Sequence, residues 1–390
     1  MYSLIIGLLI LIICGIIEYR RNSFYRKKVP VIIHINGTRG KSSVTRLIAA
    51  GLRAGGKRTI AKTTGSAPRL IFENGEETPI IRHHGANIKE QLKIIKFAAE
   101  KKTEILVLEC MAVTPEYQWV TEQKVVRSNI GVITNSRLDH LDLMGPGIRN
   151  VTLSLCNTLP PNRIAFTSEK KMFPLMKKQA EISKTKLILS DEQSISDDNM
   201  KGFGYIEHKE NIALSLDVCE HLGIDRNIAL KGMYEANPDI GASEIFFTRF
   251  EGKMIYFSHS FAANDPESTE FLIKYIKELH PHIKSTIIVL STRADRMFRS
   301  KQLIKMLLNI DYDKILLIGE QTNTITAYAS KHNIPFNKIL NCGWTTGKQL
   351  LNITSNVAAK EIMVFGIGNI GGNGGIIVDH FRKINIKRQI

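Results

Sequence analysis

The stretch Val31-Ile-Ile-His-Ile-Asn-Gly-Thr-Arg-Gly-Lys-Ser-Ser-Val44 decides how this chain folds and what it can bind. The apolar run from Val31 to Ile35 predicts a buried strand, and the glycines after it predict a tight turn into a helix from about Ser42 to Ala54. The turn lacks the first glycine of a standard P-loop. It keeps small residues whose N–H groups can converge on phosphate, a lysine (Lys41) that can reach the β- and γ-phosphates, and a Ser42 hydroxyl that can hold Mg²⁺. A nucleotide site is therefore predicted, with a lysine at an ordinary strand-to-helix turn as the alternative.

Composition narrows the class of protein and its partners. The chain has 390 residues, 43% of them hydrophobic and 23% charged, which is enough for a sizeable core and for two domains. The formal net charge of +16 favours anionic partners such as phosphates, acidic lipid or an acidic polymer. Nucleic acid is disfavoured because the basic residues are dispersed and no aromatic-rich basic strand pattern stands out. The five cysteines are odd in number and form no C-x-x-C pair, which favours a reducing compartment over disulfides or a zinc site.

The N-terminal segment predicts a membrane anchor. Residues Met1 to Ile17 carry no charged side chain, and a helix of this length at ~1.5 Å per residue reaches roughly 25 Å, slightly less than a ~30 Å hydrocarbon core. Positive charge follows the apolar run, unlike in a signal peptide, so we expect one transmembrane helix in the cell membrane and cytoplasmic domains. The basic residues are Arg20, Arg21, Arg26, Lys27 and Lys28. The alternative is a buried N-terminal helix of a soluble protein, although such a helix normally has a polar face.

After this anchor, over 1–28, short apolar strands alternate with helical segments from Val29 onward. The alternation predicts an α/β fold with open, mostly parallel sheets covered by helices. The breaker-rich stretch Asn237-Pro-Asp-Ile-Gly-Ala-Ser243 indicates a boundary, so we expect a P-loop nucleotide-binding domain over 29–240 and a smaller α/β domain over 241–390. The expected strands are 31–35, 104–109, 129–134, 163–167, 253–257, 286–290, 314–318 and 362–366, and helices are expected over 211–222 and 267–279.

Acidic side chains follow two of these expected strands. Glu109 ends one strand, and the stretch that follows another carries Asp139, His140 and Asp142. Carboxyl ends of parallel strands meet at one sheet edge, where ligands bind in open α/β sheets. Because Mg²⁺ takes oxygen ligands and keeps several waters, Glu109 fits as its second protein contact. Taken singly, each of these residues could instead be a helix cap or a solvated surface group.

The stretch Gly366-Ile-Gly-Asn-Ile-Gly371 follows a strand and spells a dinucleotide-binding fingerprint. That fingerprint requires an acidic residue about 20 positions later, at the end of a second strand. The chain stops at Ile390, so we interpret the glycines as a tight loop that closes the second domain.

Taken in order, these elements resemble the Mur ligase superfamily, which includes folylpolyglutamate synthase. The chain is most similar to the membrane-anchored ligase subunits of bacterial poly-γ-glutamate (capsule) synthases, which have a similar glycine-rich end. The resemblance spans nearly everything after the anchor, and the order of motifs is specific although each motif alone is weak. The matching segments are 36–43, 62–65, Glu109, 134–142, 208–213, 262–268, 293–296 and 364–372.

The resemblance implies a role for each candidate site residue. Lys41 and the loop would hold the phosphates of ATP, Asn211 would lie near the base, and the segment around Asp265 would face the nucleotide. Arg293 would reach the γ-phosphate, and His140 with Glu109 would serve a second metal ion. The implied phosphate-loop residues are Gly37, Thr38, Arg39, Gly40, Lys41, Ser42 and Ser43, and the implied ligands of the first Mg²⁺ are Ser42, Thr64 and Glu109.

Three departures from the family pattern are visible. Larger members use a carbamylated lysine downstream of the histidine, whereas here no lysine lies between Lys124 and Lys170. The acidic residue expected before the Asn-Pro element of the second domain is replaced by His259-Ser260. The anchor also leads straight into the nucleotide-binding domain, without a domain for a UDP-linked sugar, which disfavours a cell-wall precursor as substrate.

By resemblance, the protein is expected to be an ATP-dependent amide ligase that extends poly-γ-glutamate at the cytoplasmic face of the membrane, with membrane subunits that carry the polymer outward. The segment from Arg82 to Glu90 could help to bind the polyanionic chain, or it could be a solvated hairpin and helix start. A ligase that adds glutamate to a folate-type acceptor is a second reading. A membrane-tethered P-loop ATPase that energises an export complex is a third, although it leaves Arg293 and Asp265 unexplained.

Overall fold

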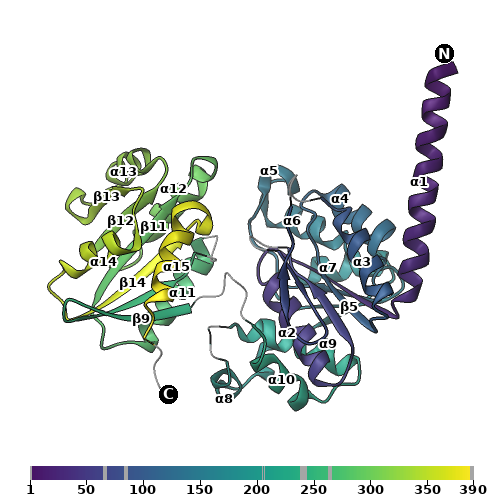
Figure 1. Ribbon diagram of the computed structural model, residues 1–390, viewed down its shortest axis with the longest axis horizontal. Helices are drawn as coiled ribbons and strands as arrows, with labels where there is room; N and C mark the ends of the chain where they lie inside the picture. Colours follow the sequence, from purple (N-terminus) through teal and green to yellow (C-terminus); the bar gives the residue numbers. More distant parts are fainter. Residues whose placement is uncertain are drawn as a thin grey trace. The chain divides into compact units, whose positions relative to one another are not determined.

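A computed structural model describes residues 2–64, 68–82, 87–203, 205, 207–237, 244–261 and 266–386. The chain divides into two compact units, Met1–Asp239 and Ile240–Ile390 (Figure 1). Each unit contains one sheet with helices against it, which confirms the predicted α/β class with mostly parallel sheets.

The sheet of unit 1 has eight strands in the order β4-β3-β2-β5-β1-β6-β7-β8. Strand β1 pairs in parallel with β5 on one side and with β6 on the other, so the carboxyl ends of all three lie at one edge. Strands β3 and β4 add an antiparallel margin beyond β2. The strand bounds are Val31–Asn36 (β1), Thr59–Lys62 (β2), Arg69–Ile71 (β3), Glu77–Pro79 (β4), Ile105–Glu109 (β5), Ile130–Ile133 (β6), Ile164–Thr167 (β7) and Lys186–Leu189 (β8).

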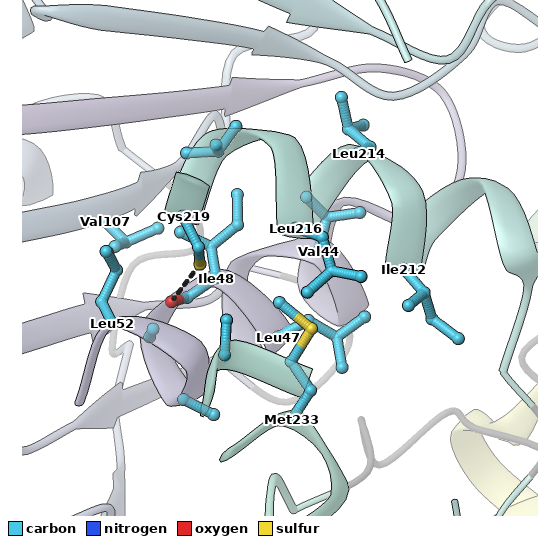
Figure 2. Packing of buried hydrophobic residues seen from close by; sticks show 14 of the residues in the cluster. Val44, Leu47, Ile48, Leu52, Val107, Ile212, Leu214, Leu216, Cys219 and Met233 are labelled. Carbon is cyan, nitrogen blue, oxygen red and sulfur yellow. Dashed lines mark hydrogen bonds between the residues drawn. The ribbon is translucent and has the colours of Figure 1, made fainter. Parts of the chain in front are cut away.

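Helices cover this sheet and bury its apolar side chains. On one face α2 packs against α9 and α10, and Figure 2 shows Leu47 and Ile48 of α2 within this cluster, with the Cys219 thiol donating to the Ile48 carbonyl over 3.8 Å. On the other face α3 covers β2 and β5. The helices are Tyr2–Lys28 (α1), Lys41–Ala54 (α2), Glu90–Glu100 (α3), Pro115–Val120 (α4), Leu141–Met144 (α5), Gly147–Cys156 (α6), Phe173–Ile182 (α7), Asp197–Lys201 (α8), Lys209–His221 (α9) and Arg226–Tyr234 (α10), with a π-helical turn Thr121–Val126 (η1) and a 3₁₀ turn Glu192–Ser194 (η2).

Helix α1 occupies the predicted anchor segment. Its C-terminal part docks on unit 1 beside α3 and η1 (Figure 1): Asn22 Nδ2 donates to the Val125 carbonyl at 2.9 Å, and Arg26 Nε donates to the Val126 carbonyl at 2.9 Å. Its N-terminal part is apolar and exposed, as at Leu11, which is 71% exposed. Within the described ranges, no helix combines the length and the apolar character needed to cross a membrane. The transmembrane assignment therefore stays a prediction.

Unit 2 has a six-stranded sheet in the order β13-β12-β11-β14-β10-β9, parallel except for β9. Its core contains Phe257 and Phe381, whose rings stack at 4.1 Å between centroids. The glycine-rich segment turns back tightly after β14: Gly368 has φ +94°, and a Cβ there would lie 2.5 Å from the Ser291 carbonyl oxygen. The bounds are Glu244–Phe250 (β9), Lys253–His259 (β10), Pro266–Leu279 (α11), Ser285–Thr292 (β11), Met297–Leu307 (α12), Lys314–Gly319 (β12), Thr322–Lys331 (α13), Ile339–Gly343 (β13), Gly347–Ser355 (α14), Glu361–Gly368 (β14) and Gly375–Lys383 (α15).

Candidate active site

The loop between β1 and α2 contains two glycines at positions where a side chain does not fit. Gly37 has φ +133°, and a Cβ there would lie 2.0 Å from Thr134 Oγ1. Gly40 has φ +77°, and its Cβ would lie 2.7 Å from Asn211 Oδ1. Both positions are left-handed and closely covered, so only glycine fits. The loop precedes the N-terminus of α2, the arrangement that binds phosphate with backbone N–H groups.

The segment after β6, which begins at Thr134, holds this loop in place with hydrogen bonds. The Thr38 hydroxyl donates to Asn135 Oδ1 at 2.8 Å, and the same oxygen accepts from the Arg39 backbone N–H at 3.1 Å. The Thr134 hydroxyl donates to the Arg39 carbonyl at 2.6 Å. Arg39 also forms an ion pair with Asp139 at 2.8 Å. Asp139 thus acts on the loop through Arg39, while Asn135, for which the sequence suggested no role, bonds to two loop residues.

Lys41 is the first residue of α2, and its side chain curls back over the loop. Its ammonium donates to the Gly37 carbonyl at 2.6 Å. Burial lowers the pKa of Lys41, and the nearby Glu109 carboxylate opposes this effect. A cation held over converging N–H groups is the arrangement that binds the outer phosphates of a nucleotide. Ser43, the last of the predicted phosphate-loop residues, lies in the first turn of the same helix.

Glu109 is the last residue of β5, and its carboxylate contacts the other residues that were predicted to surround one metal ion. It is only 2% exposed. One carboxylate oxygen, Oε2, accepts from the Ser42 hydroxyl at 2.8 Å and from the Thr64 backbone N–H at 2.7 Å. Carboxylate and hydroxyl oxygens suit Mg²⁺, which needs few protein ligands because it keeps waters and phosphate oxygens. Ser42 and Glu109 fit such an ion. Thr64 contacts Glu109 through its backbone N–H, and its hydroxyl donates to the Cys110 carbonyl at 3.4 Å, so its role as a metal ligand stays a prediction.

The predicted second metal position is less complete. His140 lies just before α5 with φ +45°, and its Nε2 atom is 3.9 Å from Asp139 Oδ1. Asp142 is exposed on α5. In the part of the chain that the structure describes, no three His, Cys, Asp or Glu side chains gather closely enough to hold a metal ion. A second metal held by His140 and Glu109 therefore stays a prediction.

Asn211, the predicted base contact, lies in the first turn of α9 and covers Gly40. Its amide Nδ2 donates to Glu207 Oε1 at 2.8 Å, which fixes the orientation of the amide. Burial raises the pKa of Glu207. Glu207 was not predicted from the sequence; its position four residues ahead of Asn211 was the only available signal.

The predicted residues of unit 2 are described within that unit. Arg293 follows β11, and its guanidinium pairs with Asp295 at 2.9 Å. It also lies against the glycine-rich segment, because a Cβ on Gly371 would be 2.7 Å from Arg293 Nη1. His259 and Ser260 are fully buried at the end of β10. Asp265 and its neighbours 262–264 lie outside the described residues.

A buried histidine–glutamate pair joins β1 to the turn η1. His34, on β1, contacts Glu122 Oε2 on η1 through Nδ1 at 2.7 Å, and both side chains are 0% exposed. The Ser128 N–H and hydroxyl donate to Glu122 Oε1 at 2.8 and 2.9 Å. Burial opposes protonation of the imidazole, but the Cys110 sulfur and the Glu122 carboxylate outweigh it and raise the pKa of His34 to about 10.

Replacing His34 by glutamine is expected to destabilise unit 1 and to change how its stability depends on pH. Loss of one partner of a buried pair typically costs about 3–5 kcal/mol. Because the pKa of folded His34 is raised to about 10, the pair stabilises fully below the unfolded pKa of about 6.5 and is lost as pH rises through about 10. The wild-type midpoint of urea unfolding should therefore fall over this window and the variant midpoint should fall less. Equal slopes would contradict this assignment.

Two family models match the chain. The model described as Mur ligase middle domain matches residues 35–237, and the one described as Poly-gamma-glutamate synthase CapB C-terminal domain matches residues 245–384. The protein described as Capsule biosynthesis protein CapB from Bacillus anthracis is 37% identical over 385 residues, covering 97% of this chain and 82% of that protein. PGA synthase CapB from Bacillus subtilis (strain 168) is 33% identical over 393 residues, covering all of both chains.

Solved structures share the fold at low sequence identity. E. coli FolC in complex with DHPP and ADP has a TM-score of 0.69 at 16% identity, with 94% of this chain and 92% of that chain covered. A bifunctional folylpolyglutamate synthase/dihydrofolate synthase from Yersinia pestis, complexed with AMPPNP and Mn, has a TM-score of 0.68 at 13% identity, covering 93% and 92%.

The fold and the phosphate site define the class of this protein, an ATP-dependent amide ligase built on a Mur ligase middle domain. The matched C-terminal domain and the full-length relatives narrow that class. The chain belongs to the CapB family of poly-γ-glutamate synthases, which confirms the resemblance seen in the sequence.

Proposed function

We propose that this protein activates a glutamate γ-carboxylate with ATP and joins it to the amine of the next glutamate, so that a poly-γ-glutamate chain grows. The observation that carries the proposal is the convergence of Ser42 and Thr64 on one oxygen of Glu109 beside the loop that holds Lys41. The relatives named as poly-γ-glutamate synthases support glutamate as the substrate. A neighbour of the same fold whose title names bound L-glutamate, Mn and AMPPNP is consistent with it.

The chemistry explains why the reaction needs a phosphate site. A carboxylate carbon is barely electrophilic, so an amine does not displace its oxygen near neutral pH. Transfer of the γ-phosphoryl group from ATP to a carboxylate oxygen gives an acyl phosphate and ADP. The amine then attacks the carbonyl carbon, the bond to the phosphate oxygen breaks, and phosphate and a proton leave.

Different residues contribute to different parts of this reaction. The loop N–H groups and Lys41 bind and orient the phosphates and offset their negative charge. Ser42, Thr64 and Glu109 would hold the divalent ion, which supplies further charge neutralisation at the transferring group. In this proposal Arg293 binds the γ-phosphate and Asn211 lies next to the base. These two roles rest on the family resemblance.

We also propose that the exposed part of α1 attaches the protein to the cytoplasmic face of the cell membrane, next to membrane subunits that carry the polymer outward. Large apolar side chains there are largely solvent-exposed, as at Ile6 (57%) and Ile17 (59%). The basic residues that follow, including Arg20 and Arg21, would attract anionic lipid. Recovery of the full chain in the supernatant after centrifugation of a lysate without detergent would contradict this proposal.

The test of the ligase uses membranes that contain the full chain and its partner subunits, with ATP, Mg²⁺ and a panel of radiolabelled amino acids. Label in polymer is measured together with the nucleotide product. We expect incorporation of glutamate alone, with one ADP formed per amide bond. ATP cleavage without an amide product from any amino acid would instead favour an export ATPase, and label transferred only to an added folate would favour a folate-type ligase.

A further inference from the structure

A cluster of two cations and one carboxylate lies where β2 ends beside the first turn of α3. Lys62, the last residue of β2, has a side chain that is 0% exposed, and its ammonium lies 2.6 Å from Glu90 Oε1. Arg82 donates to the same carboxylate with two nitrogens, Nε to Oε2 at 2.8 Å and Nη2 to Oε1 at 2.9 Å. Lys62 also donates to Gln91 Oε1 at 3.3 Å. A single carboxylate thus holds both cations.

Stability alone does not explain this arrangement. Lysine is almost never fully buried unless it is paired, because removing its charge from water is costly. An apolar residue at Lys62 would fill the α3-facing core more cheaply, as Ile60 on the same strand does. Arg82 bonds to Glu90 with two nitrogens. Residues 83–86 lie outside the described part of the chain, so binding of a polyanion by the segment 82–90 stays a prediction. We therefore examined which other residues the cluster holds in position.

The cluster reaches the metal carboxylate by two routes. Gln91 Nε2 donates to the backbone carbonyl of Glu109 at 3.0 Å. Arg82 Nη1 donates to the backbone carbonyl of Thr64 at 3.3 Å, and the N–H of Thr64 is the group that donates to Glu109 Oε2 at 2.7 Å. The first turn of α3 therefore contacts Glu109 directly through Gln91. It contacts Thr64, which orients the Glu109 carboxylate, through Arg82.

We propose that Glu90 is a positioning residue for the divalent-metal site. By holding Arg82 and Lys62, it fixes Thr64 and the end of β5, so that the Glu109 carboxylate stays aimed at the Ser42 hydroxyl. This inference rests on the proposed function, because it assigns Glu90 to the metal site of that same ligase. Partners that orient metal ligands without touching the metal commonly change affinity about 10- to 100-fold when removed.

The test measures Mn²⁺ binding to the full chain in the presence of ADP by electron paramagnetic resonance. Glu90→Gln is expected to weaken Mn²⁺ binding about 10- to 100-fold. It should raise the Mg²⁺ concentration for half-maximal ATP cleavage by a similar factor, with the rate at saturating Mg²⁺ nearly restored. The matched control is Glu100→Gln, which makes the same change at the exposed end of α3, where Glu100 pairs with Lys96 at 3.5 Å.

A buried Lys62 without its partner could unfold the Glu90→Gln protein, so a double variant, Lys62→Met with Glu90→Gln, removes both charges. It should fold, as judged by its circular dichroism spectrum and thermal transition, and still bind Mn²⁺ weakly. Wild-type Mn²⁺ affinity in this folded double variant would overturn the inference while leaving the proposed function intact. Failure of the wild-type chain itself to bind Mn²⁺ with ADP would overturn the metal site and this inference together.

Discussion

Replacing Lys41 by alanine is expected to lower the rate of glutamate-dependent ATP cleavage by about 10²- to 10³-fold. The Lys41 ammonium lies over the phosphate loop, where it donates to the Gly37 carbonyl at 2.6 Å. A cation in this position offsets charge that accumulates on the transferring phosphoryl group, and water does so less well. The steady-state rate of ADP formation in membranes gives the effect directly.

The fold should survive this change, because the Lys41 ammonium has no carboxylate partner at hydrogen-bond distance within the described residues and bonds only to carbonyls of the loop itself. Lys93→Ala is the matched control, since Lys93 lies on the exposed side of α3. It should cleave ATP at the wild-type rate. If Lys41→Ala retained more than about a tenth of that rate, the loop would not be the phosphate site.

Replacing Glu109 by glutamine is expected to reduce turnover by a similar factor, about 10²- to 10³-fold, for a different reason. Glutamine has nearly the same shape and can still accept from the Ser42 hydroxyl and the Thr64 N–H. It lacks the negative charge that a hard divalent cation requires. The loss should therefore appear as a higher Mg²⁺ requirement as well as a lower maximal rate, measured by titrating Mg²⁺ at fixed ATP.

Glu116→Gln provides the comparison, because Glu116 is exposed on α4 and its carboxylate makes no contact with the phosphate loop among the described residues. Its Mg²⁺ titration should match the wild-type curve. A Glu109→Gln protein with an unchanged Mg²⁺ requirement would show that the metal is held elsewhere, and the convergence of Ser42 and Thr64 on this carboxylate would then be purely structural.

The central strands were predictable from the sequence because parallel strands covered on both faces are continuous apolar runs. The segments expected at 104–109, 129–134 and 163–167 correspond to β5, β6 and β7. The other strands were missed, namely β2, β3, β4 and β8 of unit 1 and β9 and β13 of unit 2. β3 and β4 have three residues each and are partly exposed, so neither gives an apolar run. β8 contains only the short run Leu187-Ile188-Leu189, and none of its residues is buried.

The proximity of Ser42 to Glu109 was predictable, because the carboxyl ends of the neighbouring parallel strands β1 and β5 lie at one sheet edge. The roles of Lys41, Ser42 and Glu109 stay predictions. The site was not predictable where a role arises from contacts between distant segments. Lys62 and Glu90 meet only because β2 ends beside the start of α3. The π-helical turn that brings Glu122 to His34 is equally invisible, since no residue spacing distinguishes it from an ordinary α-helix.

Helix α1 would restrict the movement of the ligase if, as proposed, it attaches the protein to a membrane. It runs without a break from Tyr2 to Lys28, and Asn22 and Arg26 bond its C-terminal part to unit 1. A flexible linker of n residues has an end-to-end distance of about 5–6 Å × √n, so the attached domain could move over that range. A docked helix is a rigid connection and allows much less movement. If the apolar part of α1 is held in lipid as proposed, the phosphate loop would stay at a constant distance from the membrane and in a constant orientation. Each product would then be released at the same place, where a stationary exporter could receive it.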